Sequence, residues 1–74
     1  MEFEQVRDVI VEILGVEEEK VTMEANMVTD LGADSLDLAE LMMAMEESTG
    51  KVIEDEYVPH LKTVGDIVTY LQNN

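Results

Sequence analysis

Apolar residues recur at helical spacing in three stretches of the chain. Over residues 2–14 they lie three or four positions apart, which predicts an amphipathic helix. Gly15 follows directly, and glycine is the residue type that most often ends a helix in the left-handed conformation. We expect the apolar stripe of this helix to face the core, and its members are Phe3, Val6, Ile10, Ile13 and Leu14.

The second stretch, residues 35–49, predicts a helix with two different faces. Asp34 is placed to cap it, Asp37 stands near the positive end of the helix dipole, and Gly50 ends it. The inward face has i, i+3, i+4, i+7 spacing and comprises Leu38, Leu41, Met42 and Met45. The other face mixes acidic and large apolar side chains and comprises Leu36, Glu40, Met43 and Glu47.

The third stretch predicts a helix that begins after Thr63. Thr63 and Asp66 have nearly the spacing of a capping box, and Tyr70 falls at the edge of the inward face. Residues 72–74 are expected to form a frayed polar tail. The inward face comprises Val64, Ile67, Val68 and Leu71.

The connection over residues 15–34 is long for a compact domain. Its charge run, residues 17–20, is expected to be solvated, but it also contains too many apolar residues for a free loop. We expect these apolar residues to lie across the helices and close the core, and they are Val21, Met23, Ala25, Met27, Val28 and Leu31.

The connection after Gly50 is predicted to run extended through a buried Ile53 and then form a short helix. Asp55 is its expected cap, and Pro59, which lacks an N–H, limits it to at most two turns. No stretch alternates as a strand does. The sequence therefore predicts an all-α fold in one domain over residues 1–74, a small four-helix bundle with three main helices and a short third one.

The chain is strongly acidic: eighteen acidic and four basic residues give a formal charge of −14. That charge repels nucleic acid and anionic membranes and favours protein partners with basic patches. With no cysteine and a single histidine, one chain has no disulfide, no thiolate site and no multi-histidine metal centre. No apolar run approaches the ~20 residues of a membrane span, and the acidic residues 1–4 are unlike a signal peptide, so we expect a cytoplasmic protein.

Ser35 is the strongest candidate for chemistry. It is predicted at the mouth of the second helix, between Asp34 and Asp37, with its hydroxyl facing water. A hydroxyl needs a neighbouring base to act as a nucleophile, but His60 lies on another predicted element and no Gly-x-Ser-x-Gly elbow surrounds the serine. Independent catalysis is therefore disfavoured, whereas another protein can easily reach and modify this hydroxyl.

Two further interpretations concern the acidic residues. Asp30, Asp34 and Asp37 lack the spacing of the twelve-residue calcium loop, so we expect weak divalent binding and no dedicated metal site. An acidic interaction module without a prosthetic group is compatible with the charge and the amphipathic second helix. It gives no reason, however, for a capped and exposed serine at a helix start.

Residues 30–37, Asp-Leu-Gly-Ala-Asp-Ser-Leu-Asp, closely resemble the attachment site of acyl carrier proteins, whose Asp-Ser-Leu motif carries 4′-phosphopantetheine. The likeness covers nearly the whole chain, including residues 6–16 and 63–66. It implies a four-helix bundle without catalytic activity of its own. A holo-carrier-protein synthase, which is a phosphopantetheinyl transferase, would move 4′-phosphopantetheine from coenzyme A to Ser35. The acyl chain would then ride as a thioester on the thiol of the arm.

The resemblance also implies partners and contact residues. It describes a monomer that serves acyl transferases, ketosynthases, reductases and dehydratases with basic docking patches. The matching docking positions are Asp34, Leu36, Asp37, Glu40, Met43, Glu46 and Glu47. An acyl tail withdrawn into the bundle would contact residues that are equally compatible with plain core filling, namely Val6, Met27, Val28, Leu41, Met42, Met45, Ile53 and Leu61.

Fatty acid biosynthesis is the expected pathway, but four departures from the family pattern leave another carrier role open. Met27 and Thr49 stand where aromatic residues are usual, Glu54 replaces a frequent proline, and Pro59 interrupts the short helix. None of these changes touches Ser35. They concern the acyl pocket and the short helix, so a specialised carrier for polyketide or other acyl or aminoacyl groups is the alternative.

Overall fold

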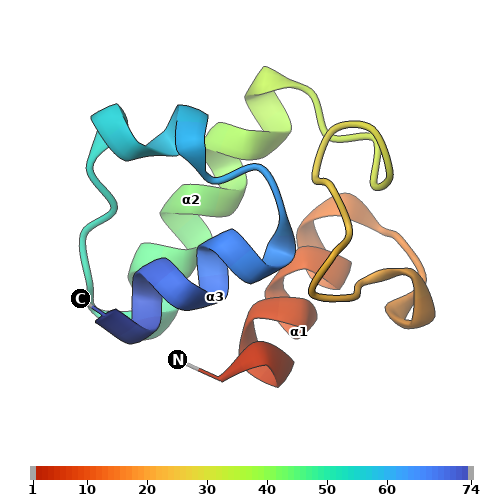
Figure 1. Cartoon of the computed structure of the whole chain (residues 1–74), viewed down its shortest axis with the longest axis horizontal. Helices are drawn as coiled ribbons and strands as arrows, with labels where there is room; N and C mark the ends of the chain where they lie inside the picture. Colours follow the sequence, from red (N-terminus) through yellow and green to blue (C-terminus); the bar gives the residue numbers. More distant parts are fainter. Residues whose placement is uncertain (1, 74) are drawn as a thin grey trace.

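The computed structural model describes residues 2–73, apart from the side chain of Asp55. Within that range the chain is all-helical and has no strand, as predicted (Figure 1). Three α-helices form the body, and two 3-10 segments lie in the connections. In chain order the elements are α1 (Phe3–Leu14), η1 (Glu18–Lys20), α2 (Ser35–Thr49), η2 (Asp55–His60) and α3 (Val64–Asn73).

The helix ends follow the signals in the sequence. Glu2 and Gln5 form a capping box at the start of α1. Gly15 and Gly50 follow α1 and α2 in the left-handed conformation, with φ of 68° and 71°, which a residue without Cβ adopts at no steric cost. At α3, the Asp66 N–H donates to Thr63 Oγ1 and the Thr63 N–H donates to Asp66 Oδ2, so the predicted cap is confirmed.

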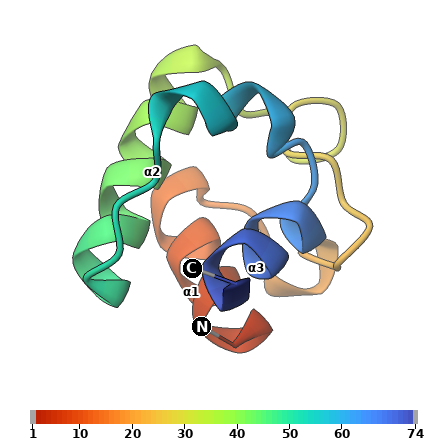
Figure 2. The ribbon, with the colours of Figure 1, turned by 60° about the vertical axis from the view of Figure 1, so that its left-hand side comes forward.

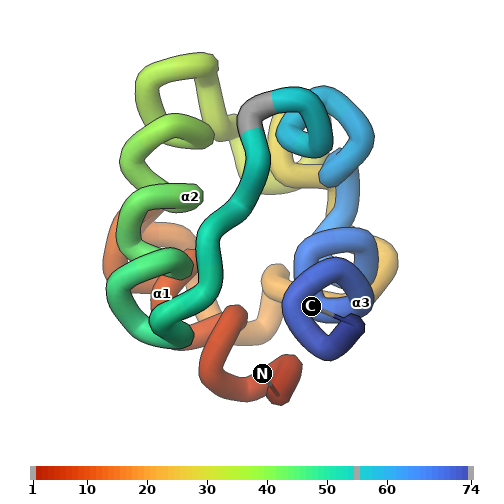
Figure 3. Tube along the Cα trace, turned by 90° about the vertical axis from the view of Figure 1, so that its left-hand side faces the viewer, coloured from red at the N-terminus to blue at the C-terminus, as the bar shows by residue number. Residues whose placement is uncertain are grey.

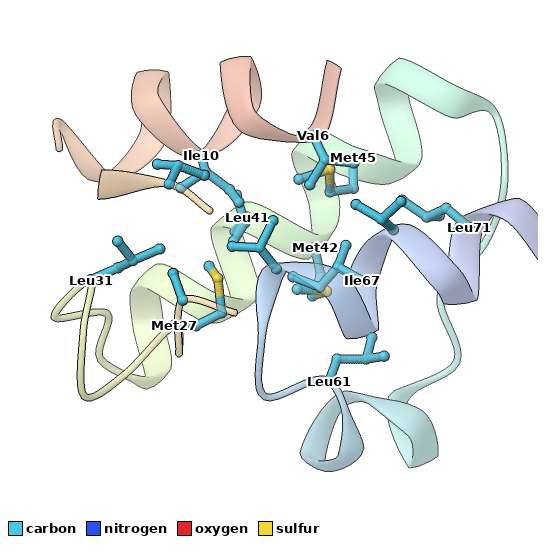
Figure 4. Close-up of a cluster of buried hydrophobic side chains, with 14 of the residues drawn as sticks. Val6, Ile10, Met27, Leu31, Leu41, Met42, Met45, Leu61, Ile67 and Leu71 are labelled. Atoms are coloured by element: carbon cyan, nitrogen blue, oxygen red, sulfur yellow. The ribbon is translucent and has the colours of Figure 1, made fainter. Parts of the chain in front are cut away.

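The core lies where α1 packs against both α2 and α3 (Figure 4). Each buried aliphatic side chain contributes about 1.5–3 kcal/mol to folding, so this cluster is the main source of stability in a chain without disulfides. Leu38, predicted on the inward face of α2, is only partly buried. The side chains labelled in Figure 4 come from all three helices and both long connections: Val6, Ile10, Met27, Leu31, Leu41, Met42, Met45, Leu61, Ile67 and Leu71.

The long connection between α1 and α2 is fastened to the start of α3 through its backbone. The Val64 N–H donates to Ala25 O at 3.0 Å, and the Gly65 N–H donates to Met23 O at 2.8 Å. In the other direction, the Met27 N–H donates to Lys62 O at 2.9 Å. These bonds satisfy backbone groups that a buried loop otherwise leaves unpaired, and they fix the path of the chain toward α2.

Several details differ from the sequence-based expectations. Met23 and Val28 were expected in the core but are exposed, because they lie on the outer side of the connection while its other apolar residues, Val21, Ala25, Met27 and Leu31, point inward. The N-cap position of η2 is held by Glu54 and not by Asp55. Gln72 and Asn73 continue α3, and Asn74 lies outside the described residues.

The connection after α2 runs back along that helix before it forms η2, which lies near the start of α2 (Figures 2 and 3). Ile53 is buried in this connection, as predicted. η2 is a six-residue 3-10 segment that contains Pro59, in agreement with a short and irregular helix. No helix within residues 2–73 has the length and apolar character required to cross a bilayer.

Substitution of Gly65 tests the fastening of the long connection. Alanine is the better helix former by about 1 kcal/mol, but a Cβ at Gly65 would lie 2.9 Å from the carbonyl oxygen of Met23. We therefore expect Gly65→Ala to lower the free energy of unfolding by about 1–3 kcal/mol in urea titrations. Thr69→Ala, at an exposed position of the same helix, should be neutral or slightly stabilising. A Gly65→Ala protein as stable as the unmodified chain would contradict the close approach.

Candidate functional site

The start of α2 is held by two aspartates that cap each other's backbone. The Asp37 N–H donates to Asp34 Oδ1 at 2.9 Å, and the Asp34 N–H donates to Asp37 Oδ2 at 3.2 Å. This reciprocal box confirms the predicted cap and satisfies a free donor of the first helical turn. Ser35 is the first residue of α2, so the box sets the direction in which its side chain leaves the backbone.

The turn before α2 has its own side-chain bonds. Asp30 Oδ2 accepts the Asn26 N–H at 2.7 Å, and Asn26 Oδ1 accepts the N–H groups of Val28 and Thr29 at 2.9 and 3.0 Å. The Asp30 carboxylate therefore braces this turn. Sequence reasoning considered Asp30 as a possible ion ligand and as part of the octet, and it gave the carboxylate no structural role.

The three residues between Asp30 and Asp34 anchor the chain to the core. Leu31 and Ala33 are buried, and the Ala33 N–H donates to Met27 O at 2.9 Å. Gly32 between them has φ of 72°, which makes glycine the favoured residue there. The residues that precede Ser35 in the octet thus have structural roles, and they present the serine at the surface.

Ser35 itself is exposed, and no hydrogen bond joins its hydroxyl to another described residue. His60 is exposed on η2 and does not line either groove described below. An exposed hydroxyl without hydrogen-bond partners is open to modification by a second protein. Among the side chains that the structure describes, which exclude that of Asp55, no group of three histidine, aspartate or glutamate residues is placed to hold a metal ion.

An open, mainly apolar groove begins at Ser35 and lies between α2 and η2. Its volume is about 490 Å³. A carboxylate, that of Glu46, lies in its wall among the apolar side chains. The lining residues are Ser35, Leu38, Ala39, Met42, Met43, Glu46, Ile53, Val58 and Pro59.

A second groove lies beside the turn that precedes α2, and it is lined by residues of that turn, of α2 and of the segment from Val58 to Lys62. Its volume is about 370 Å³. Leu38, Val58 and Pro59 line both grooves, so the two hollows adjoin at these three residues. Sequence reasoning did not assign Val58 or Pro59 to a pocket, because the packing of an irregular segment leaves no periodic signal.

The eight residues suggested for an acyl pocket are divided among the first groove, the second groove and the core. Met42 and Ile53 line the first groove. Met27, Val28 and Leu61 line the second, although Val28 is exposed rather than enclosed. The remaining three are fully buried in the core and line neither groove: Val6, Leu41 and Met45.

The outer face of α2 carries the exposed apolar residues that the spacing predicted. Leu36 is 79% exposed and Met43 is 66% exposed, and Glu40 and Glu47 are exposed on the same helix. Large apolar side chains rimmed by charge are typical of docking surfaces. The structure therefore leaves this face available to a partner.

Comparison with known proteins agrees with the geometry. The family model described as the phosphopantetheine attachment site matches residues 4–71. The chain belongs to the acyl carrier protein family. Its structure is similar to that of a protein from Mycobacterium tuberculosis described as "a putative acyl carrier protein", with a TM-score of 0.89 and 31% sequence identity over 96% of this chain and 95% of that chain.

Membership in the family assigns the domain as an attachment site for 4′-phosphopantetheine. Carriers of this type are generally non-catalytic and interact with phosphopantetheinyl transferases and acyl-handling enzymes. The carrier's residues fit such a group, because Ser35 is an exposed hydroxyl at the positive end of α2 and an apolar groove begins beside it. When bound, the group supplies the thiol that this cysteine-free chain lacks.

Substitutions of Asp34 separate its cap from its charge. Asp34→Ala removes both the negative charge and the oxygen that accepts the Asp37 N–H, whereas Asp34→Asn removes the charge alone. We expect the alanine variant to lose about 1 kcal/mol in free energy of unfolding and the asparagine variant to lose less than half of that. Equal losses in thermal or urea melts would mean that the charge of Asp34, and not its cap, stabilises α2.

Proposed function

We propose that Ser35 carries the 4′-phosphopantetheine arm and that acyl intermediates ride on it as thioesters. The observation that supports this assignment most directly is the geometry of Ser35, an exposed hydroxyl without hydrogen-bond partners among the described residues, on the first turn of a braced helix. A phosphopantetheinyl transferase would supply the arm from coenzyme A. The chain is then a substrate and carrier for other enzymes and not a catalyst.

The proposed pathway is fatty acid biosynthesis, with a polyketide, acyl or aminoacyl carrier role as the alternative. The apolar lining of the two grooves supports a hydrocarbon cargo. In this proposal an acyl chain lies against Met42 and Ile53 in the first groove, or against Met27, Val28 and Leu61 in the second. The segment η2 takes the place of the short third helix of the bundle.

The docking surface in this proposal is the outer face of α2. Leu36 and Met43 supply apolar contacts, and Glu40 and Glu47 supply negative charge that is free to meet basic patches. Asp34 caps the same helix and Asp37 and Glu46 lie on it, but their carboxylates already accept backbone hydrogen bonds. The partners are the transferase and the acyl transferases, ketosynthases, reductases and dehydratases, which meet a monomeric carrier in the cytoplasm.

An acidic interaction module without a prosthetic group is the second candidate. The exposed apolar residues on a charged helix support it, since they suit protein docking in either role. It leaves the braced serine and the adjoining groove without a use, and we therefore rank it below the carrier.

Attachment of the arm is tested by intact-mass analysis after incubation with a phosphopantetheinyl transferase and coenzyme A. We expect the unmodified chain to gain one phosphopantetheine and Ser35→Ala to gain none. Ser48→Ala is the matched control, because Ser48 is also exposed on α2 and is the only other serine in the sequence. A folded chain that gains no mass, or a Ser35→Ala chain that does, contradicts the carrier assignment.

Charge reversal tests the docking face. We expect Glu40→Lys with Glu47→Lys to slow arm attachment at low salt by about tenfold, because steering by opposite charges raises association rates. Glu12→Lys with Glu19→Lys changes the net charge equally at exposed positions outside α2 and should slow the reaction much less. If the two double variants have the same rate and the same salt dependence, net charge alone matters and the docking face is wrong.

A further inference from the structure

Glu46 differs from the other glutamates of α2 in what its carboxylate contacts. Its Oε2 atom accepts the backbone N–H of Ile53 at 2.8 Å, and the residue is half-buried. Glu40 and Glu47 are exposed, and neither carboxylate makes a hydrogen bond to another described residue. Sequence reasoning grouped Glu46 with the docking charges, but its geometry is that of a side chain fastened to the connection after α2.

Few hydrogen bonds fix the middle of that connection. It has no regular secondary structure between Gly50 and η2, and it runs alongside α2 (Figures 2 and 3). At its beginning Thr49 Oγ1 accepts the Lys51 N–H at 3.0 Å, and Lys51 Nζ donates to Leu71 O at 2.6 Å. Between this anchor and η2, the bond from Glu46 to Ile53 ties the backbone to α2 at 2.8 Å, and a longer bond of 3.5 Å joins the Glu54 N–H to the Tyr70 hydroxyl on α3.

Loss of this bond would leave a buried donor without an acceptor. Ile53 is only 3% exposed, and an unpaired buried N–H is costly, more so when its former partner was charged. The connection can relieve that cost by moving Ile53 toward water. Such a movement shifts a wall of the first groove, because Ile53 and Glu46 both line it together with Ser35.

We propose that Glu46 is a positioning residue. Its bond holds Ile53 in place and so maintains the shape of the first groove, beside the group that Ser35 carries. Ser35 and Glu46 are eleven positions apart on one helix, which corresponds to about 16 Å at 1.5 Å per residue. The bond therefore acts at the distant part of a groove that begins at the serine. The consequence for cargo rests on the proposed function, whereas the bond and its effect on Ile53 do not.

Amide hydrogen exchange by NMR on the whole chain tests the bond directly. In the unmodified protein, the Ile53 amide should exchange at least about tenfold more slowly than that of Val52, which is exposed and donates no hydrogen bond to a described residue, after correction for intrinsic rates. Equal protection of the two amides would overturn the proposal before any variant is made.

Variants then assign the protection to the carboxylate. Glu46→Ala should speed exchange at Ile53 by about tenfold relative to Ile10 in the core, and Glu46→Gln, which retains an oxygen acceptor, by less than about threefold. Glu47→Ala and Glu47→Gln are the matched controls and should leave Ile53 unchanged. If Glu46→Ala has no larger effect than Glu47→Ala, the proposal fails. Should Glu46→Ala not fold, the proposal is still tested by exchange at Ile53 in Glu46→Gln and Glu47→Gln, and by the comparison of Ile53 with Val52 in the unmodified protein.

The rate of arm attachment separates positioning from charged docking. Both glutamine substitutions remove one negative charge, so docking by charge predicts the same slowing for Glu46→Gln and Glu47→Gln. Positioning predicts that Glu46→Gln keeps the unmodified rate within about twofold, because the acceptor is retained. Equal slowing overturns the proposal. A chain that accepts no arm at all contradicts the proposed function. In that case the exchange measurements by themselves test whether Glu46 holds Ile53.

Discussion

The backbone pairing between the long connection and the start of α3 is the constraint on which the site depends. Three bonds join residues 23–27 to residues 62–65, and they bring together segments that are about half the chain apart. One of them, from Met27 to Lys62, lies within the turn at Asn26 and Asp30. With them, the buried Leu31 and Ala33 complete a path that delivers the backbone to the first turn of α2 in one orientation.

Six carboxylates in and just before α2 fall into two groups with different roles. The first group stabilises local structure, because each carboxylate accepts a backbone N–H; its members are Asp30, Asp34, Asp37 and Glu46. Glu40 and Glu47 make no such bond and remain exposed. A charge of −14 repels itself in the folded state, so carboxylates that satisfy backbone donors offset part of that repulsion where they stand. Counting acidic residues on a helix therefore overstates the number that are free to meet a partner.

Sequence reasoning predicted the three α-helices because each has a strong local signal. Helical spacing, glycine in the left-handed position and the pairs Asp34–Asp37 and Thr63–Asp66 are all contained within a few residues. The position of Ser35 followed from the same local signals. The exposure of Val28 and the roles of Val58 and Pro59 were not predictable in this way, since each depends on packing between segments distant in the sequence. The bond from Glu46 to Ile53 was missed for the same reason: a glutamate on a helix surface has no pattern that distinguishes a fastened carboxylate from a free one.

The two walls of the first groove are built to different degrees of rigidity. The α2 wall belongs to a capped helix whose inward residues Leu41, Met42 and Met45 lie in the core. The opposite wall is a connection and a 3-10 segment, in which few backbone hydrogen bonds are regular and side chains provide the attachments. Free energies of local opening are lowest where such attachments are few. The orientation of Ser35 and the position of the wall opposite α2 thus depend on different bonds, the first on the caps of Asp34 and Asp37 and the second on side-chain attachments of the connection.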